Sequence, residues 1–141
     1  MDITQIPFNH LIGLQAAAPE SGFLLSLPAG TQYTNHLGTV HGSALLALAE
    51  AGSGAFLMQQ FGDGAGFIPV VRKLEARFRK PASGQVFARS LTQAEDVQRW
   101  KTELASRGRL SAGIFMEVVD SKEVVVLSAT VEWFVTTKAE A

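Results

Sequence analysis

The chain has 141 residues and a formal net charge of -1, from 12 Lys+Arg against 13 Asp+Glu, so its charge favours neither nucleic acid nor a membrane surface as a partner. Its length predicts a single domain over residues 1–141, and its 47% hydrophobic content excludes a disordered or fibrous chain. It has no cysteine, which excludes disulfides, thiolate metal sites and a cysteine nucleophile.

The N-terminal part predicts a short helix and a strand. Residues 1–14 lack a basic start followed by an apolar run, and no stretch approaches the roughly 20 apolar residues that span a bilayer. We therefore expect a soluble, cytoplasmic protein. Apolar residues at helical spacing around Pro7 predict a short helix within residues 6–14, and residues 23–27 predict a strand.

Residues 41–61 predict a long helix. Leucine, phenylalanine and many alanine residues occur on every side of it, together with Gly52 and Gly54. A helix that is apolar all round is a buried helix, and its small residues let a sheet approach closely. Glu50 is the only ionisable side chain between His41 and Asp63.

The second half of the chain predicts mostly sheet. After a glycine-rich turn at residues 62–66, residues 70–80 alternate between apolar and charged side chains, as in a half-buried strand. Further strands are expected over residues 86–93, 110–119 and 124–135. Between them, Asp96 is expected to cap a helix that ends at Gly108. These elements predict an α+β fold in which an antiparallel sheet wraps around one central helix.

Glu50 is the residue that most needs an explanation. A lone buried carboxylate is costly, so such a group raises its pKa, finds a partner or faces a polar cavity. The alternative is that Glu50 lies on an exposed stripe or bonds a structural partner. Because its helical neighbours offer no polar stripe, we favour a functional role.

Residues 35–43, Asn-His-Leu-Gly-Thr-Val-His-Gly-Ser, lead into the same helix. The start of a helix presents unpaired N–H groups and the positive end of the helix dipole, which suit a developing oxyanion. Each residue also has a structural explanation. Asn35 fits a turn, His41 fits a first-turn residue whose side chain is satisfied, and Gly42 fits a tight packing point.

Taken together, these residues resemble the hotdog-fold thioesterase superfamily, in particular its phenylacetate-degradation-type branch acting on acyl-coenzyme A, including members without an assigned substrate. Asn35, His41-Gly42-Ser43 and Glu50 stand at the spacings of that family, and residues 78–84 resemble its aromatic-x-x-Pro-Ala-x-x-Gly strand end. The likeness covers residues 8–135. It implies a hotdog fold, with one long helix wrapped by an antiparallel sheet and here an inserted helix near 96–107.

The resemblance implies hydrolysis of an acyl-CoA thioester to a free acid and coenzyme A. The Gly42 amide would polarise the thioester carbonyl, and Glu50 would act as a general base on water or as a nucleophile. Asn35 and His41 would orient the thioester or the water. No metal or separate cofactor is implied, because coenzyme A enters as part of the substrate.

Helix geometry predicts self-association. Gly42 and Glu50 are eight residues apart, which is about 12 Å along one helix axis and roughly 80° around it. One thioester carbon can hardly touch both, so Glu50 would come from a second subunit whose helix runs antiparallel. We expect a homodimer with two shared sites, or a dimer of such dimers, and the resemblance implies the same.

Three features depart from the family pattern. Ser43 replaces a second glycine, although its backbone amide is still present to contact substrate. A strand hydroxyl found in many relatives is missing from residues 67–71, which weakens the positioning of water. The segment 96–107 lengthens a connection between strands, as in hotdog proteins whose substrates are unassigned.

Two groups of side chains are candidates for substrate contacts. Basic residues of one strand could bind the phosphates of coenzyme A, or could be solvated or contact another subunit: Arg72, Lys73, Arg77, Arg79 and Lys80. Aromatic residues could line an acyl pocket or belong to the ordinary core: Phe8, Phe56, Phe61 and Trp100.

Two other functions stay open at this point. His36 and Glu50 are fourteen residues apart, which resembles the acyl-carrier-protein dehydratases of the same fold, but the Phe-Pro-Gly that follows their histidine is missing. A non-catalytic module that binds acyl-CoA would fit the missing hydroxyl, since a fold does not guarantee activity. Hydrolysis is the preferred function.

Overall fold

The computed structural model describes residues 1–62 and 66–138. Within these ranges six strands form one antiparallel sheet in the order β1-β2-β4-β5-β6-β3. The strands are β1 (Gln15–Ala16), β2 (Leu25–Leu27), β3 (Phe67–Phe78), β4 (Val86–Ser90), β5 (Arg109–Asp120) and β6 (Val125–Thr137). The helices are η1 (Ile3–Gln5), α1 (Pro7–Leu11), η2 (Thr31–Tyr33), α2 (Gly42–Phe61) and α3 (Ala94–Arg107).

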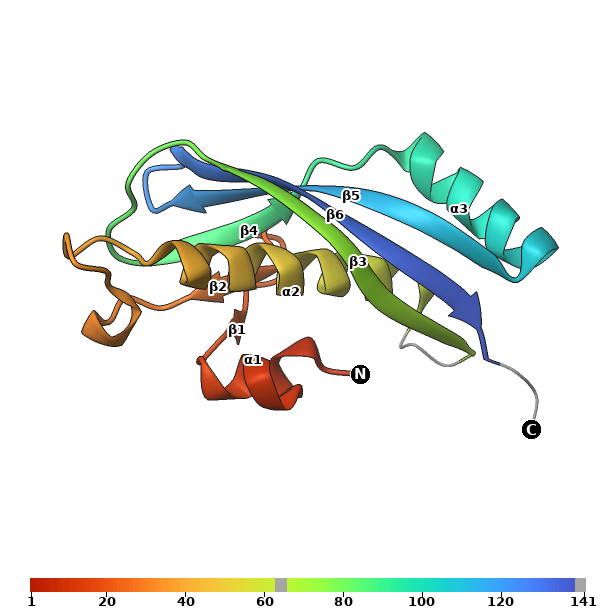
Figure 1. The fold of residues 1–141 in the computed structure, drawn as a ribbon, viewed down its shortest axis with the longest axis horizontal. Coiled ribbons are helices and arrows are strands. Elements are labelled where there is room, and N and C mark those ends of the chain that lie inside the picture. Colours follow the sequence, from red (N-terminus) through yellow and green to blue (C-terminus); the bar gives the residue numbers. More distant parts are fainter. Residues whose placement is uncertain (63–65, 139–141) are drawn as a thin grey trace.

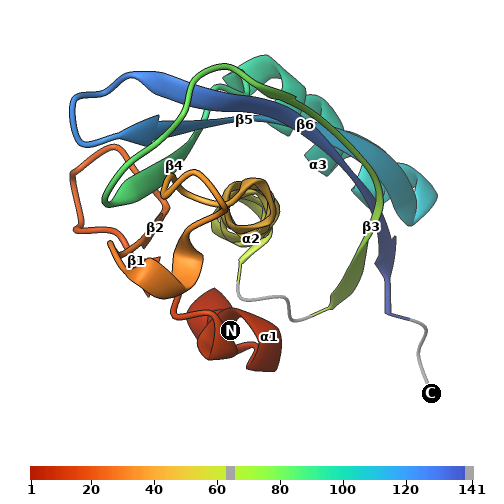
Figure 2. The same cartoon turned by 60° about the vertical axis from the view of Figure 1, so that its left-hand side comes forward.

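Helix α2 is the buried helix that the sequence predicts, and the sheet curves around it (Figure 2). Leu48, Ala49 and Leu57 have no exposed side-chain surface. Gly52 allows the sheet to approach, because a Cβ there would lie 2.9 Å from Met116 Cε of β5 and 3.0 Å from an alanine Cβ of β4. The expected arrangement, one long helix wrapped by an antiparallel sheet, is confirmed.

Helix α3 lies on the opposite face of the sheet from α2 (Figure 1) and buries Val97 and Trp100. It ends at Gly108, which has a left-handed φ of 72°, as predicted. Its predicted start at Asp96 is wrong, because the helix begins at Ala94 with a glutamine as N-cap. The Asp96 carboxylate instead lies in the first turn, where a negative charge interacts favourably with the helix dipole, and it pairs with Arg99 at 2.9 Å.

Strand β3 lies at the edge of the sheet and is paired only with β6 among the described residues. It begins at Phe67, three residues before the predicted start, and a β-bulge lies between Val71 and Lys73. The bulge shifts the alternation, so that Phe67 packs against Phe61 of α2 and, after the bulge, Phe78 packs over the start of α2. The charged side chains that follow the bulge point to the other face, as the alternation predicts.

The segments that flank α2 are shorter than predicted. The N-terminal helix within residues 6–14 spans Pro7–Leu11, and the strand within 23–27 spans Leu25–Leu27. The turn expected at 62–66 falls partly on residues 63–65, which lie outside the described ranges. Among the described helices, none combines the length and the apolar character needed to cross a membrane.

Candidate active site

Helix α2 begins with one free backbone donor. His41 is the N-cap, and its Nδ1 accepts a hydrogen bond of 2.9 Å from the Ser43 N–H. The His41 carbonyl accepts from the next two amides, those of Ala44 and Leu45. The Gly42 N–H has no acceptor among the described residues, so it is the donor that the positive end of the helix dipole presents to a ligand.

The cap decides how His41 and Ser43 can act. Because Nδ1 of His41 accepts a hydrogen bond, the neutral ring carries its hydrogen on Nε2, and His41 is exposed. The sequence analysis predicts that the Ser43 amide contacts substrate, but this N–H already donates its hydrogen bond to the capping His41 side chain. Gly42 is therefore the donor left at this helix start, with the Nε2–H of His41 beside it in the chain.

The two motifs that carry the resemblance meet at this helix start. Val40 donates a hydrogen bond of 2.8 Å from its N–H to the carbonyl of Ala82, in the loop after β3. A Cβ at Gly42 would lie 3.1 Å from Cε1 of Phe78, which explains the glycine as a tight packing point. The sequence did not single out Phe78 as a site residue, although it is the aromatic residue of the second motif.

Asn35 closes a turn in this structure. Its Oδ1 accepts from the N–H groups of Leu37 and Thr39 at 2.9 and 3.2 Å, and its Nδ2 donates to Thr39 Oγ1 at 3.0 Å. None of these bonds reaches His41, Gly42 or Ser43. The turn explanation thus accounts for the side-chain oxygen of Asn35, and one hydrogen of its Nδ2 is left to orient a ligand.

Glu50 lies two turns into α2 and is half-buried. Its carboxylate makes no hydrogen bond or ion pair within residues 1–62 and 66–138, and its burial raises the pKa of this carboxyl above the ordinary 4.5. The nearby Ser53 hydroxyl donates to the Glu50 backbone carbonyl and accepts from Trp133 Nε1, so it fixes the helix rather than the acid. Neither an exposed stripe nor a structural partner explains Glu50.

Removing the charge of Glu50 should stabilise the fold at neutral pH. A raised pKa means that the native state binds more protons than the unfolded state between the ordinary pKa of 4.5 and the raised native pKa, so stability falls as the pH rises through this interval. We expect Glu50→Gln to raise the melting temperature by a few degrees at pH 8 and not at pH 4. The exposed Glu20→Gln is the control for thermal unfolding, and an equal shift at both pH values would contradict the burial of a charged Glu50.

The basic residues predicted to bind phosphate, except Lys80, lie on the face of the sheet away from α2. Arg72 places its guanidinium carbon 3.8 Å above the ring of Phe134, and Arg79 Nε donates to Ser128 Oγ at 3.2 Å. Lys73 pairs with Glu75 at 2.8 Å, a hydrogen bond that raises the pKa of the lysine and lowers that of the glutamate.

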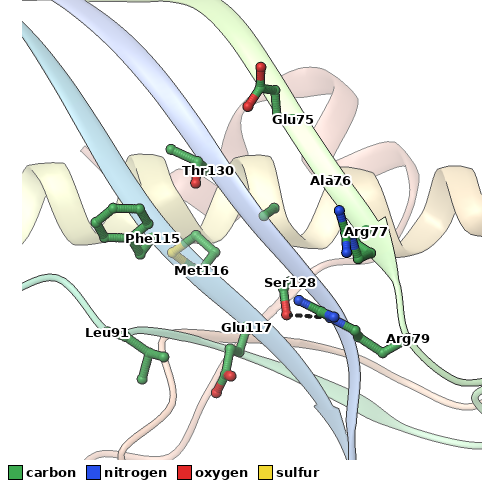
Figure 3. Close-up of a pocket in the computed structure, with 11 residues that line it drawn as sticks. Glu75, Ala76, Arg77, Arg79, Leu91, Phe115, Met116, Glu117, Ser128 and Thr130 are labelled. Atoms are coloured by element: carbon green, nitrogen blue, oxygen red, sulfur yellow. Dashed lines mark hydrogen bonds between the residues drawn. The ribbon is translucent and has the colours of Figure 1, made fainter.

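A hollow of about 770 Å³ lies on this outer face, lined partly by Arg77, Arg79, Phe115 and Glu117 (Figure 3). Within one chain, the sheet separates Arg72, Lys73 and Arg79 from Gly42 and Glu50. Lys80 is exposed in the loop after β3, next to the Pro-Ala motif. The structure thus brings the second motif to the helix start but leaves the strand arginines on the other side.

A smaller hollow of about 240 Å³ lies beside the first turns of α2. Its lining includes Phe8 and Ile12 from the N-terminal segment, Ala47 of α2, and both neighbours of Gly42, His41 and Ser43. The other aromatic candidates lie elsewhere. Phe56 is partly buried and packs against the core, Phe61 contacts Phe67, and Trp100 is a buried residue of α3. Of the four aromatic residues, Phe8 alone lines this hollow.

Comparison with known proteins places the chain in a family. Residues 6–135 match the family described as a domain of unknown function, DUF4442. A protein of unknown function from Pseudomonas aeruginosa, described as a probable thioesterase, shares 30% identity at a TM-score of 0.80, over 96% of this chain and 91% of its own. No curated protein matches the chain.

More distant structures share the fold. A Bacillus halodurans protein crystallised with CoA is 21% identical with a TM-score of 0.67, over 91% of this chain and 74% of its own. A Haemophilus influenzae thioesterase is 15% identical with a TM-score of 0.70, over 98% of this chain and 88% of its own. The chain belongs to the DUF4442 family and has the hotdog fold of the thioesterase superfamily.

Proposed function

We propose that the protein hydrolyses the thioester bond of acyl-coenzyme A, with the Gly42 N–H as oxyanion donor and Glu50 as the base. The observation that carries the proposal is the pair of unsatisfied groups on one helix: a free N–H at the start of α2 and a half-buried carboxylate without a partner among the described residues. The thioesterase relatives support this reaction, and the Bacillus halodurans protein crystallised with CoA supports coenzyme A as the carrier.

The reaction follows from the chemistry of these two groups. Water attacks the thioester carbon, and the charge that develops on the carbonyl oxygen is stabilised by the Gly42 N–H. Glu50 takes the proton of the attacking water, and burial makes its carboxylate a stronger base than one in water. The C–S bond breaks, and the proton passes to the thiolate of coenzyme A. Direct attack by Glu50 on the carbonyl is the other route open to the same carboxylate.

Three further groups complete the proposed site. The twelve residues of β3 contain no hydroxyl side chain, so other groups must position the attacking water. The Nε2–H of His41 and the spare amide hydrogen of Asn35 are the polar groups of the motif that remain to orient water or thioester. The loop lysine, Lys80, is the basic residue we assign to the phosphates of coenzyme A, since it shares a loop with Ala82, which contacts the segment before α2.

We propose that the site is shared between two copies of the chain. Helix α2 is continuous from Gly42 to Phe61, so Gly42 and Glu50 of one chain are separated by about 12 Å along its axis. A single thioester cannot contact both groups at this distance. An antiparallel partner helix would bring its own Glu50 to the Gly42 amide. The edge of β3 is unpaired within the described ranges and has Ile68 and Val70 exposed, so it offers a surface for such a dimer or for a dimer of dimers.

Hydrolysis of an acyl-CoA panel tests the proposal. We expect release of free thiol, detected with a thiol reagent, and a loss of roughly 100-fold or more in kcat for Glu50→Gln, the usual contribution of a general base. The fold should be kept, because the change is nearly isosteric, and circular dichroism checks this. Glu103→Gln, in α3, is the matched control and should keep full activity.

Each other outcome selects a different function. Full activity in Glu50→Gln removes Glu50 from the mechanism. A change in enoyl-CoA absorbance without thiol release indicates a hydroxyacyl-thioester dehydratase. Tight binding of acyl-CoA with neither reaction indicates a binding module, the function that the absence of a hydroxyl on β3 favours.

A further inference from the structure

The hollow of about 240 Å³ lies at the start of α2, on both sides of Gly42 in the chain. The residue before Gly42 and the residue after it, His41 and Ser43, both line this hollow. A carbonyl oxygen bound to the Gly42 N–H would therefore hold its acyl group next to this space. The larger hollow on the outer face is lined by no residue of α2, so it does not offer the same continuity.

The lining of the hollow suits an uncharged group. Its apolar side chains come from the N-terminal segment, from β2 and from α2, and they are Phe8, Ile12, Leu27, Ala44 and Ala47. The remaining lining residues are Gln32, Tyr33 and Thr34 besides the pair at the helix start, so no Asp, Glu, Lys or Arg lines this hollow among the described residues. A carboxylate or phosphate would lose its hydration there without gaining an opposite charge.

The volume of the hollow limits what it can hold. At about 30 Å³ for each non-hydrogen atom, the share of one liquid water, 240 Å³ takes about eight such atoms. An apolar cavity of about 150 Å³ is known to hold benzene. The space therefore suits an acyl chain of about six to eight carbons or a single ring, and the far end of a longer chain would extend out of the hollow.

A tether holds the N-terminal wall of the hollow in place. The Tyr33 hydroxyl donates a hydrogen bond of 2.6 Å to the carbonyl of Ile12, which joins the end of α1 to the loop before α2. Gly13 follows with a φ of 79°, and a Cβ there would lie 2.6 Å from the Tyr33 oxygen. This bond fixes the positions of Ile12 and Phe8, and with them the depth of the hollow.

We infer that this hollow is the acyl site, that it selects compact apolar acyl groups, and that Phe8 and Ala47 determine the upper limit of acyl length. The inference rests on the proposed thioester hydrolysis and names its substrate class. Phe8 lines the hollow from α1 and is itself 60% exposed, and Ala47 forms part of its wall on α2. Either residue can be changed without altering Gly42 or Glu50.

Acyl-length profiles of two opposite variants test this inference. With acetyl-, hexanoyl-, octanoyl-, phenylacetyl- and palmitoyl-CoA, the wild type should show its highest kcat/KM for the middle three. Ala47→Leu should lower kcat/KM for octanoyl-CoA by roughly tenfold or more and leave acetyl-CoA nearly unchanged, since one methylene in an apolar pocket is worth about tenfold or more. Phe8→Ala should raise kcat/KM for palmitoyl-CoA relative to kcat/KM for octanoyl-CoA.

A matched control and a binding measurement separate this inference from the proposed function. Leu11→Ala, on the same helix but outside the hollow and 79% exposed, should keep the wild-type profile. In the Glu50→Gln background, calorimetric titration with the same thioesters should show the same length preference. Hydrolysis with a profile that neither variant alters would overturn the acyl site alone. Length-selective binding that Ala47→Leu abolishes, without hydrolysis in the wild type, would overturn the proposed function alone.

Discussion

Replacing Gly42 with proline should lower kcat for thioester hydrolysis by roughly 100- to 1000-fold, the usual cost of losing one oxyanion donor, while α2 stays folded. Proline removes the one N–H of the helix start that has no acceptor in the described ranges, so no hydrogen bond of the fold is lost. Gly42 is the first helical residue, a position that proline favours. His41 before it has φ -61° and ψ 137°, the conformation that a following proline prefers.

Gly42→Ala is the control that separates the donor from the packing. Alanine and proline both add a Cβ, which would lie 3.1 Å from Cε1 of Phe78, but alanine keeps the N–H. Phe78 is 54% exposed and its ring can move by the small distance needed. The kcat of both variants with the best acyl-CoA, together with far-UV circular dichroism, checks the prediction. Near-wild-type kcat in both variants would remove the Gly42 N–H from the mechanism, whereas an equal loss in both would assign the effect to the added Cβ.

Mixing two inactive variants should restore activity. If each site combines Gly42 of one chain with Glu50 of its partner, a dimer of Gly42→Pro and Glu50→Gln chains has one site with both changes and one intact site. Random pairing of equal amounts makes half of the dimers mixed, so about a quarter of the wild-type sites should be active in a two-fold dimer. Co-expression of the two chains with different tags, followed by a double purification, isolates the mixed dimers, in which about half of the sites should be active.

The same experiment can contradict the shared site. If each site lies within one chain, mixing the two variants restores no activity, because every site then carries one of the two changes. A double variant with both changes in one chain, mixed with wild type, is the complementary test: in a shared site each site of a mixed dimer carries one change, so the activity should fall on mixing. Gel filtration of the wild type as a monomer under assay conditions would also contradict the dimer.

The sequence by itself determined the central helix, the antiparallel strands and the two motifs. An apolar pattern on every side of residues 41–61 has few solutions other than burial, and the observed α2 matches it from Gly42 to Phe61. Glu50 was predicted as an anomaly because a lone acid in such a helix is costly, and it is half-buried without a partner among the described residues. These conclusions depend on local periodicity and on the energy of burial.

Only the tertiary structure decided which groups of the site are free. Hydrogen bonds over short distances claim the Ser43 amide for the cap of His41 and the oxygen of Asn35 for its turn, and the residue types do not reveal this competition. The strand arginines lie away from α2 because of the direction of the side chains in β3, where one bulge residue changes the alternation. The hollow proposed to hold the acyl group brings together α1, β2 and α2, and such contacts between distant segments arise only when the chain packs.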